Sequence, residues 1–225
     1  MKVINTKFKD LKIIKQKKHA DTRGNLRETF IKRIIKWDTL IFDYATTSKK
    51  NVLRGFHFQY KFQQAKFVTV LKGKILDCVI DLRKGSKTFG KSYKIELSEK
   101  NCKSLYIPEG FAHAYYSYAD LNIIYYKLSN YYKPKFESGI LWNDNFFKIK
   151  WPRKKPMISQ KDKKLLLFQI SKKFIGPYKN NKKIFLNSEK VNNLLSFLET
   201  NGFFLGHLIL KKLSFHSIPL SNFGL

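Results

Sequence analysis

The feature that most constrains the fold is a series of short β-branched and aromatic runs, separated by turn residues, with almost no helical periodicity before residue 144. Ala65 to Val70 and Ile75 to Leu82 flank a break that contains Gly73, which is typical of a β-hairpin. From Phe67 and from Ile75 onward, apolar residues occupy odd and even positions alike. This pattern indicates strands that are buried on both faces.

Further strands are predicted at residues 93–97, 104–107, 114–118 and 122–128. Many short strands at regular spacing favour a β-sandwich or barrel, so we predict one mainly β domain over residues 1–168 with few short helices. The pattern changes beyond it, and Ser188 to Thr200 reads as an amphipathic helix with Ser188 as N-cap. We therefore expect residues 169–225 to be a small C-terminal appendage, helical or partly disordered.

Charge is the most unusual property of the composition. The 225 residues include 45 Lys or Arg and 16 Asp or Glu, which gives a net charge of +29. A hydrophobic content of 43% with 16% aromatics excludes a disordered basic tail. Only six of the basic residues are arginines, whereas readers of nucleic-acid bases rely on the planar guanidinium. We therefore expect a lysine-coated surface and no nucleic-acid partner, with a non-catalytic basic binding module as the alternative.

The remaining composition suggests a cytoplasmic protein without a disulfide framework. Cys78 and Cys102 lie in apolar strand-like runs and form no C-x-x-C pair, so we expect two buried thiols. The first ten residues are polar and do not resemble a signal peptide. The apolar stretch Val191 to Leu213 is interrupted by polar residues, which makes a membrane-spanning segment a poor interpretation.

One predicted strand carries three polar side chains that could perform chemistry: Arg54, His57 and Gln59. A histidine within a strand is most often structural, but several polar groups on one sheet face are costly unless that face lines a wet cavity. Strict alternation would place Arg54 and His57 on opposite faces. Because Gly55 lies between them, we predict a bulge there that brings both to one face.

Other candidates are open to two interpretations. His113 follows the turn Pro108-Glu109-Gly110, where it could satisfy local backbone groups or contact a substrate at a barrel mouth. Tyr126 and Tyr132 could be core aromatics or could present their hydroxyls to a ligand. The run His57-Phe58-Gln59 lacks the second imidazole of a His-x-His metal pair, so we expect no bound metal and no cofactor.

The order and spacing of several motifs over about residues 8–165 carry a specific resemblance. The sequence resembles the dTDP-4-dehydrorhamnose 3,5-epimerases, which are metal-free cupins with a jelly-roll β-barrel. The segments that match the family pattern are Asp21 to Glu28, Val52 to Gln59, Gln64 to Val68, Asp81 to Gly90, Ile107 to His113, Tyr126 to Asp144, Trp151-Pro152 and Ser159 to Asp162.

The resemblance implies an isomerase of the EC 5.1.3 class that inverts carbons next to the ketone of a nucleotide-linked 4-keto-6-deoxy sugar. It implies His57 as the base, Asp162 as the carboxylate that orients it, and Tyr126 as the acid on the opposite face. Lys66 would stabilise the enolate. Of the other polar positions, the resemblance implies substrate-binding roles for Arg23, Glu28, Arg54, Gln59, His113 and Tyr132.

The resemblance also implies a homodimer that acts on a dTDP-linked sugar in rhamnose and lipopolysaccharide O-antigen biosynthesis. The chain departs from the family at Phe42-Asp43-Tyr44, which replaces a Gln-x-Asn that usually touches the nucleotide. The alternatives are therefore a related epimerase that acts at one centre only, or one that acts on another nucleotide sugar.

Overall fold

The computed structural model of the chain describes residues 1–36 and 38–168. The chain divides into two units, and all of these residues belong to the first, Met1–Tyr178. The predicted appendage at 169–225, with its helix at Ser188 to Thr200, lies outside the described residues and stays a prediction.

Strands dominate the described part of the chain, as the sequence pattern predicts. The strands are β1 (Lys2–Asn5), β2 (Lys12–Lys15), β3 (Lys18–Asp21), β4 (Gly24–Arg27), β5 (Phe42–Ser48), β6 (Leu53–Gln59), β7 (Lys66–Lys72), β8 (Lys74–Asp81), β9 (Ser92–Ser98), β10 (Lys103–Ile107), β11 (Phe111–Ser117), β12 (Asn122–Leu128) and β13 (Glu137–Gly139). The described helices are a 3-10 turn, η1 (Pro134–Phe136), and the single turn α1 (Gln160–Lys163). No helix among the described residues has the length and hydropathy needed to cross a membrane.

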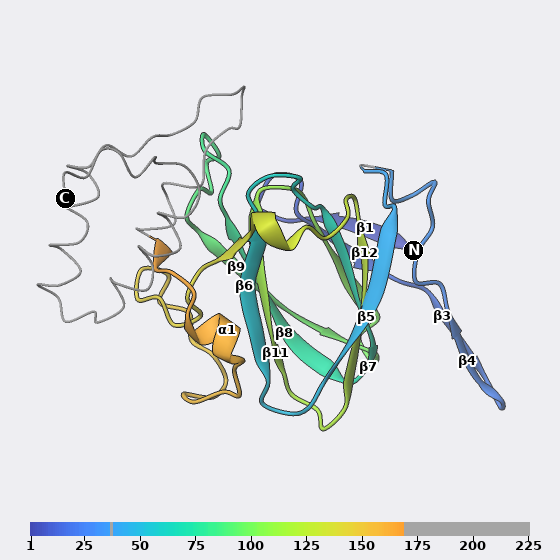
Figure 1. Cartoon of the computed structure of the whole chain (residues 1–225). Coiled ribbons are helices and arrows are strands. Elements are labelled where there is room, and N and C mark those ends of the chain that lie inside the picture. Colours follow the sequence, from blue (N-terminus) through green and yellow to red (C-terminus); the bar gives the residue numbers. More distant parts are fainter. Residues whose placement is uncertain (37, 169–225) are drawn as a thin grey trace, which may run out of the picture. The chain divides into compact units, whose positions relative to one another are not determined.

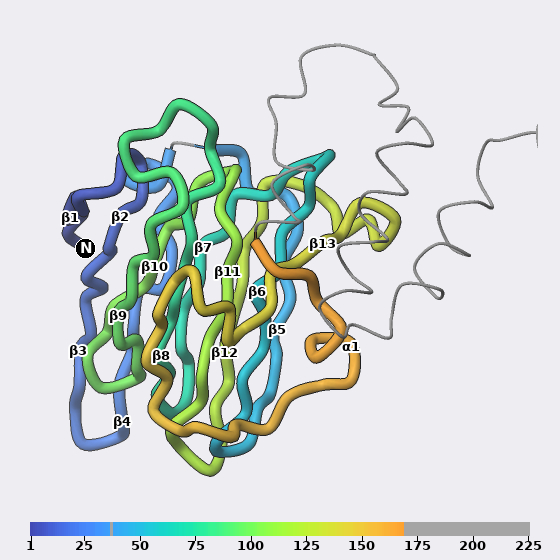
Figure 2. The backbone as a smooth tube through the Cα atoms, turned by 90° about the vertical axis from the view of Figure 1, so that its left-hand side faces the viewer, coloured from blue at the N-terminus to red at the C-terminus, as the bar shows by residue number. Residues whose placement is uncertain are grey.

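The strands form two antiparallel sheets that face each other (Figure 1). One has six strands in the order β1-β2-β10-β7-β12-β5, and the other has five in the order β13-β6-β11-β8-β9. Figure 2 shows the strands of both sheets from the side. Strands β3 and β4 form a separate two-stranded hairpin, which projects away from the sheets. Neighbouring strands in each sheet are mostly not consecutive in the chain, which is the connectivity of a jelly roll.

Three apolar layers explain why so many strands lack simple alternation. The central layer lies between the two sheets and includes Val68, Val79 and Ile124. The outer face of the five-stranded sheet buries Cys78 and Ile80 against the segment that contains Ile140 and Phe168. The other sheet buries its outer face, with Phe67, against Ile35 and its neighbours. Both sheets are thus covered on two faces, which confirms the interpretation of β7 and β8.

An irregularity in β6 places its polar residues. Across β11, His57 pairs with His113 and Arg54 pairs with Tyr115, so β6 contains one extra residue between these pairs. Gly55 has a φ of +109° and is followed by a cis peptide bond to Phe56. The predicted bulge is confirmed, and it lets Arg54 and His57 line the same cavity.

The predicted hairpin of residues 65–70 and 75–82 is wrong, although the turn between the two strands is present. Strands β7 and β8 belong to different sheets and do not pair, so the turn at Gly73 carries the chain from one sheet to the other. Gly73 has a φ of +82°, and a Cβ there would lie 2.4 Å from the backbone oxygen of Leu121. The prediction for the two cysteines is confirmed. Cys78 and Cys102 are both buried and free, as expected for thiols that act as small apolar side chains.

Candidate active site

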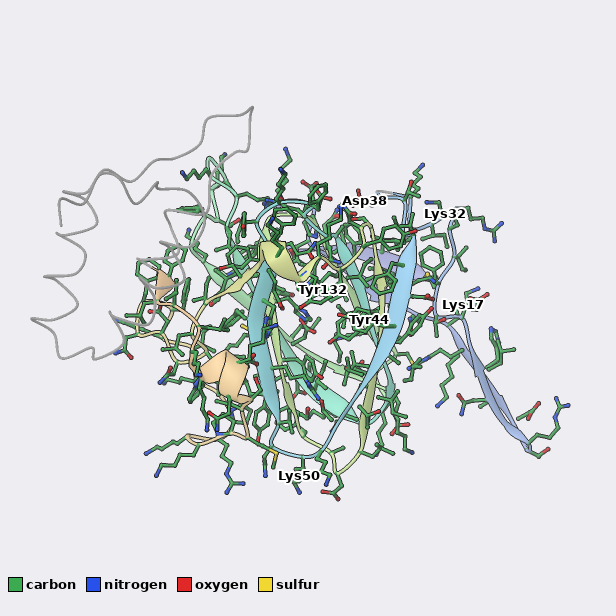
Figure 3. All side chains as sticks on the ribbon, viewed as in Figure 1. Lys17, Lys32, Asp38, Tyr44, Lys50 and Tyr132 are labelled. Atoms are coloured by element: carbon green, nitrogen blue, oxygen red, sulfur yellow. The ribbon has the colours of Figure 1, made fainter. Side chains whose placement is uncertain are left out.

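A cavity of about 760 Å³ opens between the two sheets. Residues at even positions of three strands of the six-stranded sheet point into it, because side chains alternate along a strand. They are Lys66 from β7, Tyr126 from β12, and Phe42, Tyr44 and Thr46 from β5. His57 and His113 enter from the opposite sheet, and α1 closes one side with Lys161 and Asp162. Figure 3 shows Tyr44 and Tyr132 in the space between β6 and β5.

His57 lies between two carboxylates. Its Nε2 is 3.0 Å from Oδ1 of Asp162, and its Nδ1 is 2.9 Å from Oε1 of Glu137. Burial alone would lower the pKa of His57, but the contacts with Asp162 and Glu137 outweigh it and raise the pKa. The ring is therefore more basic than a free imidazole.

The two carboxylates are held in different ways. Asp162 is buried, and its Oδ2 accepts a hydrogen bond of 3.0 Å from the backbone N–H of Gly55. The hydroxyl of Ser159 caps α1 by accepting from the Asp162 N–H. Glu137 instead receives hydrogen bonds at Oε2 from the Tyr132 hydroxyl, at 2.6 Å, and from Lys161.

Both carboxyl groups are ionised at neutral pH. Burial opposes ionisation of Glu137, but its ion pair with His57 and its bonds from Lys161 and Tyr132 prevail and lower its pKa to about 2. The pKa of Asp162 is also lowered, because His57 and the Gly55 N–H outweigh the effect of burial. The imidazole therefore lies between two negative charges.

A second histidine–carboxylate pair lies deeper in the same sheet. Nε2 of His113 is 2.8 Å from Oδ2 of Asp77, and both residues are buried. The His113 ring meets the edge of Tyr126, with the ring centroids 6.1 Å apart. His113 lines the cavity, so the structure favours the pocket interpretation of this residue over the local one.

Lys66 and Tyr126 are the buried polar residues that the six-stranded sheet contributes to the cavity wall. Burial lowers the pKa of Lys66 to about 8. Burial, with Tyr115, Tyr44 and Asp77 nearby, raises the pKa of Tyr126 well above its ordinary value. At neutral pH, the cavity thus contains a lysine that gives up its proton readily and a phenol that retains its own.

The other predicted substrate-binding residues on the cavity wall are partly engaged with the protein. Arg54 donates from Nε to the Ser48 hydroxyl at 3.1 Å. Gln59 is buried, and its amide bonds to backbone atoms of Phe62 and Lys133. Tyr132 is 47% exposed and holds Glu137. All three line the cavity, and their roles toward a substrate stay predictions.

Arg23 and Glu28 lie apart from the others. Arg23 lies at the tip of the β3–β4 hairpin, where its guanidinium pairs with Asp21 at 2.6 Å and is 88% exposed. Glu28 follows β4, and neither residue is part of the cavity wall of this chain. A single chain therefore does not bring these two predicted residues to the cavity.

Comparison with known proteins assigns the family. The model of the dTDP-4-dehydrorhamnose 3,5-epimerase family matches residues 5–169. The chain belongs to the dTDP-4-dehydrorhamnose 3,5-epimerase family. This is a family of isomerases, as the resemblance of the motifs implied. The family's enzyme from Salmonella typhimurium is 40% identical over 169 residues, which are 72% of this chain and 92% of that protein. The enzyme from Shigella flexneri is 38% identical over 168 residues, 72% of this chain and 93% of that one.

Solved structures of the family share the fold. A dTDP-6-deoxy-D-glucose-3,5-epimerase from Legionella pneumophila, crystallised with dTDP-4-keto-L-rhamnose, superposes with a TM-score of 0.74 at 34% identity. The alignment covers 80% of this chain and 99% of that one. The enzyme from Bacillus anthracis, solved with TDP and pyrophosphate, gives a TM-score of 0.71 at 35% identity, over 74% of this chain and 98% of that one. The predicted cupin jelly roll is confirmed.

Sequence reasoning gave no role to four residues of the site: Tyr44, Asp77, Glu137 and Lys161. Glu137 and Lys161 lie within the quoted motifs, but they contact each other across 24 residues of irregular chain. Asp77 meets His113 only through the pairing of β8 with β11. Tyr44 stacks on Tyr126, its cross-strand neighbour, with centroids 4.9 Å apart. The contacts of Asp77 and Tyr44 depend on strand pairing, and that of Glu137 with Lys161 depends on where α1 packs, neither of which the sequence specified.

Proposed function

We propose that this protein epimerises a dTDP-linked 4-keto-6-deoxy sugar at C3, C5 or both, converting dTDP-4-dehydro-6-deoxyglucose to dTDP-4-dehydrorhamnose. The observation that carries the proposal is the distribution of proton-transfer groups around one cavity. His57, with its carboxylates, comes from one sheet, while Tyr126 and Lys66 come from the facing sheet. The product would serve rhamnose and O-antigen biosynthesis in the cytoplasm.

The chemistry requires a base and an acid on opposite faces of the sugar ring. Protons on C3 and C5 are acidic because each carbon is next to the C4 ketone. In the proposed reaction His57 removes one proton, and the C–H electron pair moves to the C4 oxygen as an enolate. The Lys66 ammonium stabilises that oxygen, and Tyr126 returns a proton to the opposite face. Asp162 orients the ring of His57 and stabilises its charged form.

The anionic diphosphate of the substrate matches the cationic groups of the site. Arg54 lies on the cavity wall, and the net charge of +29 draws anions toward the protein. Arg23 and Glu28 can reach a nucleotide only if the β3–β4 hairpin of one chain extends to the cavity of a second chain. We therefore propose a homodimer in which the hairpins are exchanged between the two sites.

Hydrogen exchange tests the proposal directly. The protein is incubated with dTDP-4-keto-6-deoxyglucose in D₂O, and deuterium at C3 and C5 is followed by NMR. We expect incorporation at one or both carbons, and a loss of roughly 10²–10⁴-fold in His57→Ala. The rate of deuterium incorporation in Tyr126→Phe is compared with that in Tyr118→Phe, because Tyr118 is a partly buried tyrosine outside the cavity wall. Absence of deuterium from both carbons with the native protein would overturn the proposed function.

A further inference from the structure

The two carboxylates at His57 create a problem for a base. A histidine accepts a proton only at a neutral ring nitrogen with a free lone pair. Here Asp162 lies against Nε2 and Glu137 lies against Nδ1. Nδ1 is buried and has no hydrogen bond of good geometry, so Glu137 covers it as an ion pair. No substrate atom can reach Nδ1 while Glu137 remains there.

The charges around the ring favour its doubly protonated form. The titratable and charged groups that line the cavity around His57 come from β5, β6, β7, β11, β12, β13, α1 and the segments between them: Tyr44, Arg54, Lys66, His113, Tyr115, Tyr126, Tyr132, Glu137, Lys161 and Asp162. Of these, only the two carboxylates lie within ion-pair distance of the ring among the described residues. Their attraction raises the pKa of His57 against the opposing effect of burial.

The surroundings of the two carboxylates indicate which one can leave. Asp162 is buried and is fixed by the Gly55 N–H. Glu137 is anchored by side chains that are themselves accessible, since the Lys161 side chain is 58% exposed and Tyr132 is 47% exposed. These two groups already bind Oε2 of Glu137, so the carboxylate has a place to go when it leaves His57.

We propose that Glu137 is a positioning residue that covers Nδ1 of His57 in the resting enzyme and moves off toward Tyr132 and Lys161 when the nucleotide sugar binds. The movement on substrate binding rests on the proposed function, whereas the contact in the resting protein does not. Once the charge of Glu137 has moved, Nδ1 releases its proton to water. The neutral nitrogen then takes the proton from the sugar carbon, whose electron pair becomes the enolate. Asp162 stays at Nε2 throughout.

The pH dependence of the two kinetic constants tests the movement. The acid limb of kcat/KM reports the free enzyme, and that of kcat reports the substrate complex. In the native protein we expect the acid limb of kcat at lower pH than that of kcat/KM. In Glu137→Gln the two limbs should coincide. Limbs that already coincide in the native protein would overturn the proposed movement, because Glu137 would then stay at Nδ1 in the complex.

The size of the change can be stated in advance. An opposite charge at this range moves a pKa by roughly 1–3 pH units in proteins. The ratio of kcat/KM at pH 5.5 to its plateau should therefore rise by about tenfold or more in Glu137→Gln. Glu99→Gln is the matched control, because Glu99 is a partly buried carboxyl that pairs with Lys72 outside the cavity wall, and its ratio should not change. An unchanged ratio in Glu137→Gln would overturn the role of this residue.

A measurement without substrate separates this inference from the proposed function. The native protein and Glu137→Gln are labelled with ¹⁵N-histidine, and His57 is titrated by NMR, with His57→Asn used for assignment. We expect His57 to hold both ring protons to higher pH in the native protein than in Glu137→Gln. If His57 titrates identically in the two proteins, Glu137 does not act on Nδ1 in the protein without substrate, even if the enzyme is active. A lower pH midpoint in Glu137→Gln would support the contact of Glu137 with Nδ1 even if no sugar is epimerised.

Discussion

Replacing Lys66 with methionine should make the protein more stable and much less active. Lys66 lies in the cavity between the sheets, and burial lowers its pKa from 10.5 to about 8. That difference corresponds to about 3 kcal/mol by which the folded state disfavours the ammonium relative to the unfolded chain. Methionine has similar length and no charge, so Lys66→Met removes this cost.

The sign follows from proton binding. Between about pH 8 and pH 10.5, the unfolded chain holds a proton on Lys66 that the folded protein has lost. Unfolding therefore takes up this proton, and the native protein gains stability through Lys66 as pH rises through this window. Below pH 8 both the folded and the unfolded chain hold the proton, and the full free-energy cost of burying the ammonium applies. The advantage of Lys66→Met should be greatest at pH 7 and should vanish near pH 10.5.

Urea denaturation at pH 7, 8.5 and 10 measures this difference. At pH 7 we expect Lys66→Met to unfold with a free energy up to about 3 kcal/mol higher than the native protein. Lys94→Met is the control, because Lys94 is exposed on β9, and it should change stability by no more than about 0.5 kcal/mol. A Lys66→Met variant that is no more stable at pH 7, or whose advantage is the same at all three pH values, would show that the buried ammonium of Lys66 does not destabilise the fold. Its kcat should fall by roughly 10²–10³-fold, because the enolate loses its cation.

Four further outcomes follow from the described contacts. The native kcat should decline above about pH 8, since Lys66 becomes neutral there; a flat profile to pH 9.5 would contradict the role of its charge. Gly55→Ala should destabilise the fold by roughly 2–4 kcal/mol in urea denaturation, because a Cβ would lie 2.5 Å from the backbone oxygen of His113. Gly85→Ala controls for backbone strain alone, because Gly85 also has a positive φ but has open space around it. Tyr44→Ala should lower kcat by up to about tenfold, and Tyr44→Phe should not, because the stack on Tyr126 is worth roughly 0.5–1.5 kcal/mol; equal losses would show that the hydroxyl matters instead. Asp81→Asn should cost roughly 2–4 kcal/mol of stability, measured in urea, without changing kcat, because the buried carboxylate accepts hydrogen bonds from Arg83, Ser86 and Thr88.

Asp81 also has a defined pH dependence. Burial opposes its ionisation, but the bonds from Arg83, Thr88 and Ser86 prevail and lower its pKa below 3.8. Its contribution is therefore present above pH 3.8 and is lost as pH falls below that value. The difference in unfolding free energy between the native protein and Asp81→Asn should shrink on acidification.

Local patterns in the sequence predicted most of the strands. The strands around Gly73 and the bulge at Gly55 followed from alternation, turn chemistry and the cost of an inward-facing polar group. The order of strands within the sheets did not follow, because it depends on long-range pairing that local residues do not encode. The motifs together indicated the family, and no single motif would have done so.

The sequence pointed to several residues of the cavity wall but not to their arrangement. His57, Asp162, Lys66 and Tyr126 do line one cavity, as their predicted roles require. The contact between Glu137 and His57 depends on β13 pairing with the edge of β6, which periodicity cannot reveal for a strand of three residues. Arg23 could be identified by its motif, but its distance from the cavity of its own chain could be known only from the structure.

Because His57 and Tyr126 lie on facing sheets, the apolar core between the sheets sets the distance between these two residues. Packed sheets lie about 10 Å apart, a gap that side chains such as Val68, Val79 and Ile124 set between them. In the proposed reaction, the same gap sets the distances from the sugar ring to His57 on one side and to Tyr126 on the other. If the proposed reaction takes place in this cavity, substituting Val68 or Val79 should alter the ratio of inverted to uninverted sugar, although neither valine lines the cavity.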